Sequence, residues 1–184
     1  LPLKEDTQPN PVDVYSSANY AGEILLKPFI LQESATQFLI TRAFNKFGPN
    51  QVGDWLIPRT IKQVLNKKNP KLGNPDSTRD YSYISDIVNG YMLAMEFGKN
   101  GDVFNIGSGK ETSVRQVVET IIELSGFDLT PSWDTQYRKN DLLRSFGDSS
   151  KARKELVWEP KIDFRDGIEM TVEWWKEHPE LFGL

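Results

Sequence analysis

Cysteine is absent from the sequence, and histidine occurs once, at His178. Without cysteine the chain can form neither a disulfide framework nor a catalytic thiolate. A single histidine excludes a multi-histidine metal site and argues against a Ser-His-Asp triad. No metal site is therefore expected.

The sequence also has fewer basic than acidic residues. Lysine and arginine total 22 against 26 aspartates and glutamates, which gives a formal net charge of -4. A nucleic-acid binder would show a basic face, so nucleic acid is not an expected partner. No apolar run approaches the roughly 18 residues that cross a bilayer, and no signal-peptide pattern opens the sequence. We therefore expect a cytoplasmic protein with no membrane partner.

A glycine-rich dinucleotide motif is missing as well. No Gly-x-Gly-x-x-Gly follows an expected strand, so the turn that holds a cofactor pyrophosphate is not present. What the sequence does contain is an alternation of strand and helix patterns, which indicates an α/β fold. Helices are expected at residues 15–32, 52–66 (after Pro58), 87–97, 112–124, 149–156 and 164–177. Strands are expected at 38–40, from Arg79, at 102–107 and near 131–133.

The first expected helix has apolar residues at helical spacing, which should face a core. These are Ala21, Ile24, Leu25, Pro28, Phe29 and Leu31. Ser85 or Asp86 is the expected cap of the helix at 87–97, and Thr112 or Ser113 that of the next helix.

Residues 10–49 carry most of the candidate chemistry. Tyr15 stands near the head of the first helix, and Asn45 lies in a loop expected at the carboxyl end of strand 38–40. Ligands of open α/β sheets bind at that end of the strands, so both side chains are expected at one cleft.

This stretch resembles the middle of an extended short-chain dehydrogenase/reductase, from the NAD-dependent nucleotide-sugar epimerase/dehydratase family. That family has a Tyr-x-x-x-Lys helix followed by a strand that ends in Arg-x-x-Asn-x-Tyr/Phe-Gly-Pro. The sequence departs from the pattern at Asn19, where the family has its lysine. The matching residues are Tyr15, Glu23, Arg42, Asn45, Phe47, Gly48 and Pro49.

The resemblance covers nearly all of this chain but only about the carboxyl half of such an enzyme. It implies a partial Rossmann-type sheet, without the amino-terminal dinucleotide-binding half, plus a small α/β substrate-binding domain. Residues 1–50 would be the Rossmann remnant and 51–184 mainly the substrate-binding domain. Strand 102–107 would return to the sheet.

The resemblance implies a catalytic role for Tyr15, which in the family removes a proton from the sugar 4-hydroxyl while hydride passes from C4 to NAD. The family lysine lowers the tyrosine pKa and holds the nicotinamide ribose. Asn19 carries no charge, and a phenol with a pKa of about 10 is a poor base without a nearby cation. NAD is the family cofactor, with Tyr15 as its contact, but the isolated chain is expected to lack hydride-transfer activity. Alternatively, Tyr15 is an ordinary aromatic at a helix start.

A nucleotide-diphosphate sugar is the implied substrate. Asn45, Arg79 and Arg144 resemble family positions that contact the phosphates or the sugar, as suits a dianion that needs guanidinium and amide donors. Leu56 and Ile57 match a Leu-Ile-Pro motif that lines the nucleotide pocket. Alternatively, Arg79 pairs with a neighbouring aspartate (Asp80 or Asp86) and Arg144 is a solvated surface residue.

The glycine-rich turn after strand 102–107 has the composition of a phosphate cradle, from Asn105 to Gly109. The same turn in the family is largely structural, and we favour that interpretation. Trp158 is expected in the core, and one ring of Trp174 and Trp175 should be buried. His178 is expected to end the last helix.

Two functions remain open. The chain is either the substrate-binding half of a nucleotide-sugar 4,6-dehydratase/epimerase-like enzyme, or a non-catalytic nucleotide-sugar-binding or assembly module. In the second case an uncovered sheet edge would favour a homo-oligomer or a partner that supplies the missing half.

Overall fold

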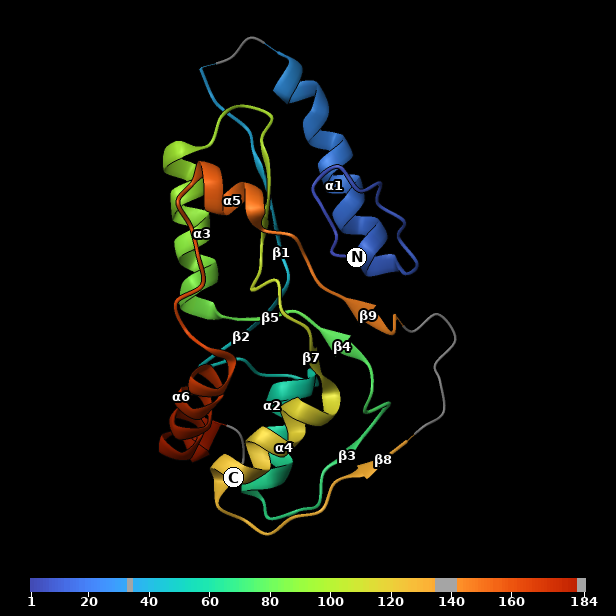
Figure 1. Cartoon of the computed structure of the whole chain (residues 1–184), viewed down its shortest axis with the longest axis vertical. Helices are drawn as coiled ribbons and strands as arrows, with labels where there is room; N and C mark the ends of the chain where they lie inside the picture. The colour runs from blue at the N-terminus through green and yellow to red at the C-terminus, as the bar shows by residue number, and fades with distance from the viewer. Residues whose placement is uncertain (33–34, 135–141, 182–184) are drawn as a thin grey trace.

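The structure is a computed structural model that describes residues 1–32, 35–134 and 142–181. It confirms the α/β class and is elongated, with α1, α3 and α5 at one end and α2, α4 and α6 at the other (Figure 1). The helices are α1 (Val14–Leu31), α2 (Leu56–Leu65), α3 (Ile84–Phe97), α4 (Val114–Ser125), α5 (Ser150–Glu155) and α6 (Phe164–Glu177). The strands are β1 (Ile40–Ala43), β2 (Asn45–Phe47), β3 (Lys71–Leu72), β4 (Thr78–Arg79), β5 (Tyr81–Tyr83), β6 (Val103–Ile106), β7 (Thr112–Ser113), β8 (Ser132–Trp133) and β9 (Arg144–Ser145).

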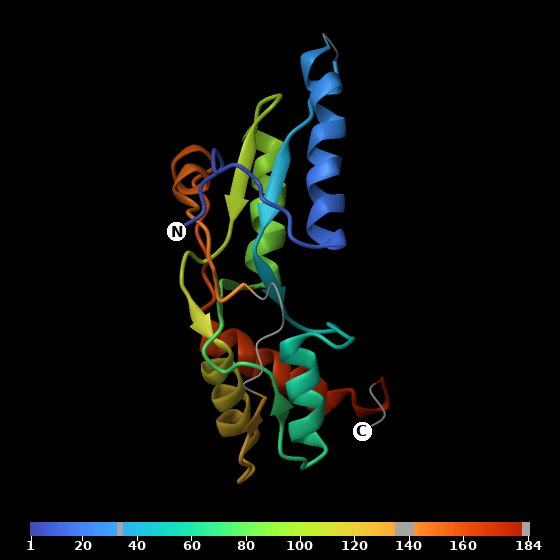
Figure 2. The ribbon, with the colours of Figure 1, turned by 90° about the vertical axis from the view of Figure 1, so that its right-hand side faces the viewer.

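Most strand pairs are parallel. β1 pairs with β6, so the strand expected at 102–107 lies beside the strand that follows α1. β2 pairs with β5, β3 with β8, and β4 lies between antiparallel β7 and parallel β9. α1 runs alongside β1 on the side away from α3 (Figures 1 and 2).

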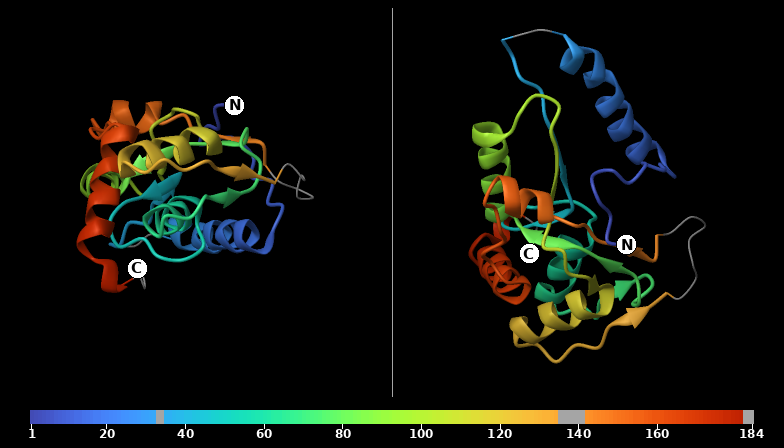
Figure 3. Two further views of the ribbon diagram at one scale, coloured as in Figure 1. Left: turned by 90° about the horizontal axis from the view of Figure 1, so that it is seen from below. Right: turned by 45° about the horizontal axis from the view of Figure 1, so that its top comes forward.

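Within the described residues, two hydrophobic clusters form the core. In the larger cluster α2, α4 and α6 lie together (Figure 3). They pack against β2 and β5. In the smaller cluster α3 and α5 pack on β6, and Trp158 is buried there as expected. Trp175 is buried in the larger cluster while Trp174 is only partly buried, which confirms the expectation for that pair. His178 is the C-cap of α6, as predicted.

Local chemistry fixes the ends of α4. Ser113 caps its start in a reciprocal capping box with Gln116, and Gly126 ends it in the left-handed conformation, with φ of 77°.

The expected cap of α3 was wrong. That helix begins at Ile84 with Tyr83 as its N-cap, so Asp86 lies in the first turn and accepts a hydrogen bond from the backbone of Ile162 instead.

The expectation that α1 faces a core was also wrong. None of its residues is buried, and apolar side chains such as Leu25 and Phe29 are exposed. Helical spacing of apolar residues shows that one face is apolar, but it does not show whether an element of the same chain covers that face. Instead, an ion pair ties α1 to β1, because Arg42 donates two hydrogen bonds to Glu23, at 2.8 and 2.7 Å.

The strand after α1 lies further along the chain than predicted. Pairing with β6 sets it at Ile40–Ala43 rather than at 38–40. Asn45 consequently belongs to β2 and not to a loop, because its backbone N–H donates to the carbonyl of Asp80 at 2.9 Å.

Candidate functional site

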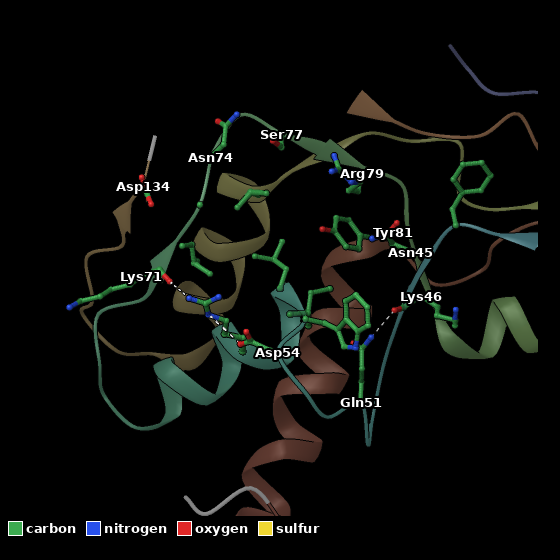
Figure 4. Close-up of a pocket in the computed structure, with 18 of the residues that line it drawn as sticks. Asn45, Lys46, Gln51, Asp54, Lys71, Asn74, Ser77, Arg79, Tyr81 and Asp134 are labelled. Atoms are coloured by element: carbon green, nitrogen blue, oxygen red, sulfur yellow. Dashed lines mark hydrogen bonds and ion pairs between the residues drawn. The ribbon is translucent and has the colours of Figure 1, made fainter. Parts of the chain in front are cut away.

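A cavity of about 1330 Å³ lies where β1 passes into β2, bordered by the start of α2, by the β3–β4 segment and by the head of α1. Five of the residues singled out from the sequence line this cavity. Figure 4 shows Asn45, Arg79 and Tyr81 near one another on its wall. The five are Tyr15, Asn45, Leu56, Ile57 and Arg79.

Tyr15 reaches the cavity from the first turn of α1. Asp13 caps this helix in a capping box with Ser16, which fixes the position of the first turn. The Tyr15 side chain is 71% exposed, and it is one of the two most exposed aromatic residues in the described part of the chain. Asn19 is not among the residues that line the cavity. Its side-chain amide donates to the backbone carbonyl of Tyr15 at 2.8 Å.

Arg79 is positioned by β4. Successive side chains of a strand point to opposite faces, so Ser77 and Arg79 lie on the cavity side and Thr78 lies on the other. Arg79 Nη1 also donates to the carbonyl of Thr78 at 2.8 Å.

Tyr81 is a lining residue that the sequence did not single out. Burial raises the pKa of its phenol to about 12, and the charge of Arg79 opposes that rise only in part. Tyr81 is therefore neutral at physiological pH and cannot serve as a base there.

Arg144 is not among the residues that line the cavity. It lies opposite Thr78 in the register of β4 and β9, on the face away from Arg79. There it donates two hydrogen bonds to Glu111, at 2.9 and 2.6 Å, and Thr78 donates to the same carboxylate. The bonds from Arg144 and then from Thr78 lower the pKa of Glu111 to about 2. The expected grouping of Asn45 with both arginines thus holds for Arg79 alone.

The glycine-rich turn after β6 is built around buried Asp80. Its carboxylate accepts hydrogen bonds from the backbone amides of Ser108, Gly109 and Gly147 and from the Ser108 hydroxyl. These donors are therefore occupied within the protein. The structural interpretation of the turn is supported, and the turn contributes no lining residue to the cavity.

Sequence reasoning missed several polar and aromatic lining residues. Trp55 is the N-cap of α2, and its side chain is 64% exposed at the cavity. Trp55 immediately precedes Leu56 and Ile57, and this position in the sequence could have marked it as a lining residue. Gln51, Asn74 and Ser77 also line the cavity, and nothing in their residue types marks them in the sequence.

Charges of both signs line the cavity, and Figure 4 shows several of them. Arg59 contacts Asp54 at 3.7 Å and donates to the carbonyl of Lys71 at 3.0 Å, so part of its charge is neutralised locally.

Among residues 1–32, 35–134 and 142–181, no group of three or more His, Cys, Asp or Glu side chains could hold a metal ion.

Comparison with known proteins identifies the family. The model for GDP-mannose 4,6-dehydratase matches residues 1–171. The chain belongs to the GDP-mannose 4,6-dehydratase family. This result confirms the resemblance to NAD-dependent sugar-nucleotide dehydratases and epimerases that the sequence motifs indicated.

Relatives of this family member include a dTDP-glucose 4,6-dehydratase from Actinoplanes sp., 32% identical over 161 residues. That alignment covers 87% of this chain and 50% of the relative, so the chain spans about half the relative's length. The structure of UDP-glucose 4-epimerase from Thermotoga maritima with UDP-glucose is 33% identical, with a TM-score of 0.89. It covers 96% of this chain and 57% of that chain. A dTDP-glucose 4,6-dehydratase from Bacillus anthracis, in complex with NAD, is 28% identical, with a TM-score of 0.85, and covers 96% of this chain and 56% of that chain.

The 184 residues of this GDP-mannose 4,6-dehydratase family member depart in two respects from the NAD-binding pattern that the resemblance implies. The 184 residues contain no glycine-rich dinucleotide turn. Asn19 replaces the cationic residue of the helix motif, and its amide is bonded to the backbone of Tyr15.

In the part of the chain that the structure describes, no helix combines the length and apolar character needed to cross a bilayer.

Proposed function

We propose that this chain binds a nucleotide-diphosphate sugar in the cavity between α1, α2 and β4. The observation that carries the proposal is the convergence of Tyr15, Asn45 and Arg79, from three separate elements, on one hollow that is large enough for such a ligand. Arg79 supplies positive charge and donors for the diphosphate, and Asn45 supplies an amide. Leu56 and Ile57 offer apolar surface beside them.

The chain is proposed to be the substrate-binding half of a 4,6-dehydratase/epimerase-like enzyme and to be inactive in hydride transfer when tested alone. Tyr15 stands at the cavity, but the residue one helical turn away is uncharged Asn19. A phenol needs a neighbouring cation to act as a base near neutral pH. NAD turnover by the 184-residue chain would contradict this part of the proposal.

Calorimetric titration tests the binding. UDP-glucose, dTDP-glucose and GDP-mannose would each be titrated into the parent chain and into the Arg79→Ala variant. Loss of a charged hydrogen-bonding group should weaken binding about tenfold to a hundredfold. Arg165→Ala is the matched control, because Arg165 pairs with Glu123 on the surface and does not line the cavity. Equal affinities for the parent and Arg79→Ala would contradict the assignment.

A second candidate function is a non-catalytic assembly module. Two observations favour it: α1 has no buried residue, and within the described chain β1 pairs along one edge only, with β6. An open strand edge beside an apolar helix face is a template for another chain, either a second copy or a partner that supplies a dinucleotide-binding half. Light scattering after size-exclusion chromatography tests this candidate. A monomer at high micromolar concentration would count against self-assembly.

A further inference from the structure

Three buried polar atoms in the cavity wall have no hydrogen-bond partner within the described chain. They are Gln51 Oε1, Asn74 Nδ2 and Ser77 Oγ. Buried polar groups in native proteins are nearly always paired, so each unpaired one calls for a physical explanation. Ser77 is the clearest of the three, because the residue is only 5% exposed. Because all three belong to lining residues of one cavity, a ligand there is the simplest source of partners.

Two of these residues lie together on a rigid segment. Asn74 and Ser77 precede Arg79 along one wall of the cavity (Figure 4). The carbonyl of Ser77 accepts from the backbone of Val114 at 2.9 Å, and the N–H of Thr78 donates to Leu143 at 2.8 Å. The backbone of the wall at Ser77 and Thr78 is thus held on both sides by other elements.

The hydrogen-bonding character of the wall can be deduced from its geometry. The backbone N–H of Asp76 donates to Asn74 Oδ1 at 3.0 Å. Because a backbone N–H can only donate, the amide oxygen must face it, and the NH₂ group is the unpaired end. The Ser77 hydroxyl can also donate, and Arg79 offers donors and a positive charge. A ligand that satisfies the unpaired atoms of this wall must be rich in acceptors, and negative charge on it would complement the guanidinium of Arg79.

We propose that Asn74 and Ser77, together with Arg79, form a strip that binds the diphosphate of a nucleoside diphosphate. This inference rests on the proposed function and adds two residues to which the sequence analysis gave no role. Gln51 lies outside the strip, because its unpaired atom is an acceptor and would repel a phosphoryl oxygen.

The test uses the 184-residue chain with three probes: UDP, uridine and inorganic pyrophosphate. Ser77→Ala and Asn74→Ala should each weaken the binding of UDP and of pyrophosphate about threefold to tenfold, the effect of one hydrogen bond. Uridine binding should not change, because uridine has no phosphate. Removal of an unpaired buried hydroxyl should leave the thermal stability of Ser77→Ala unchanged or slightly increased, whereas a structural hydroxyl would lower it.

Ser82→Ala is the matched control. Ser82 is 3% exposed and its hydroxyl is also unpaired, but it does not line the cavity. This variant should therefore bind all three probes like the parent.

The outcomes separate this inference from the proposed function. If the parent binds UDP-glucose and Ser77→Ala binds UDP equally well, the strip is wrong and the proposed function stands. Equal losses for UDP and uridine would also overturn the strip, because the hydroxyl would then contact the nucleoside. If the parent binds pyrophosphate in a Ser77-dependent way but binds no nucleotide sugar, the strip stands and the proposed function falls. Binding of neither would overturn both.

Discussion

The side-chain amide of Asn19 donates a hydrogen bond to the backbone carbonyl of Tyr15, with 2.8 Å between Nδ2 and O. The resemblance of residues 10–49 to the family motif matches these two residues to its tyrosine and its lysine. The amide is thus directed to the helix backbone of its own preceding turn. The position that would place a cation beside the phenol performs a local structural role in this chain.

Asn19→Lys is expected to fold normally and to gain no hydride-transfer activity. Lysine has a higher helix propensity than asparagine, so the variant should be as stable as the parent or more stable by a few tenths of a kcal/mol. Because the glycine-rich turn is absent, NADH formation with UDP-glucose should stay undetectable. Activity that appears in Asn19→Lys and disappears in the Tyr15→Phe/Asn19→Lys double variant would contradict this prediction.

Glu23→Ala should loosen α1. The Glu23–Arg42 pair is partly buried and ties to β1 a helix that has no buried residue of its own. Amide hydrogen exchange across Val14–Leu31 should accelerate by about tenfold or more, while exchange in α4 should not change. Glu173→Ala, which breaks the exposed pair with Lys176, is the control and should leave α1 unaffected. Unchanged exchange in Glu23→Ala would show that other contacts hold the helix.

Tyr81 should make the protein less stable at high pH. Its pKa is about 12 in the folded state and 10.0 for the unperturbed group. Above pH 10 the unfolded chain releases the proton while the folded chain keeps it, so stability falls as pH rises from about 10 toward 12. Over the whole range the free energy of unfolding should fall by about 3 kcal/mol. Urea unfolding should show a smaller loss over this range in Tyr81→Phe than in the parent, and identical profiles would contradict the prediction.

Glu111 should contribute stability that is lost in acid. Its pKa is about 2 when folded, against 4.5 for the unperturbed group, because Arg144 and Thr78 donate to the carboxylate. The contribution is present above about pH 4.5 and disappears as pH falls toward 2. Glu111→Gln should therefore melt below the parent at pH 7 and close to it at pH 2. Glu119→Gln, with the same change of charge at an exposed position of α4, should show no such convergence.

Asp80→Asn should destabilise the fold strongly. The substitution replaces one carboxylate oxygen by an NH₂ group that faces backbone donors from Gly109 and Gly147 or from Ser108. Each buried N–H left without an acceptor costs about 1–3 kcal/mol, so urea unfolding should show a loss of at least about 2 kcal/mol. The control is Asp76→Asn at an exposed pair with Arg115, where the loss should stay below about 1 kcal/mol.

The sequence alone determined features whose causes lie within a few residues. The bounds of α4 follow from the Ser113 cap and the Gly126 stop, and the strand that contains Phe104 follows from its apolar run before the glycines. The approach of Tyr15 and Asn45 to one cleft was also expected, because they were predicted at a helix head and at the carboxyl end of a strand, and the family resemblance added Arg79 as a ligand contact.

Only the tertiary structure decided the directions of Arg79 and Arg144, the two arginines to which the sequence assigned the same role. Arg79 and Arg144 looked alike in the sequence, but the register of β4 against β9 turns Arg79 to the cavity and Arg144 to Glu111 on the opposite face. The apolar spacing of α1 likewise could not show that no described element covers it. Periodicity and caps are local properties of the chain, whereas register and burial depend on segments that are distant in sequence.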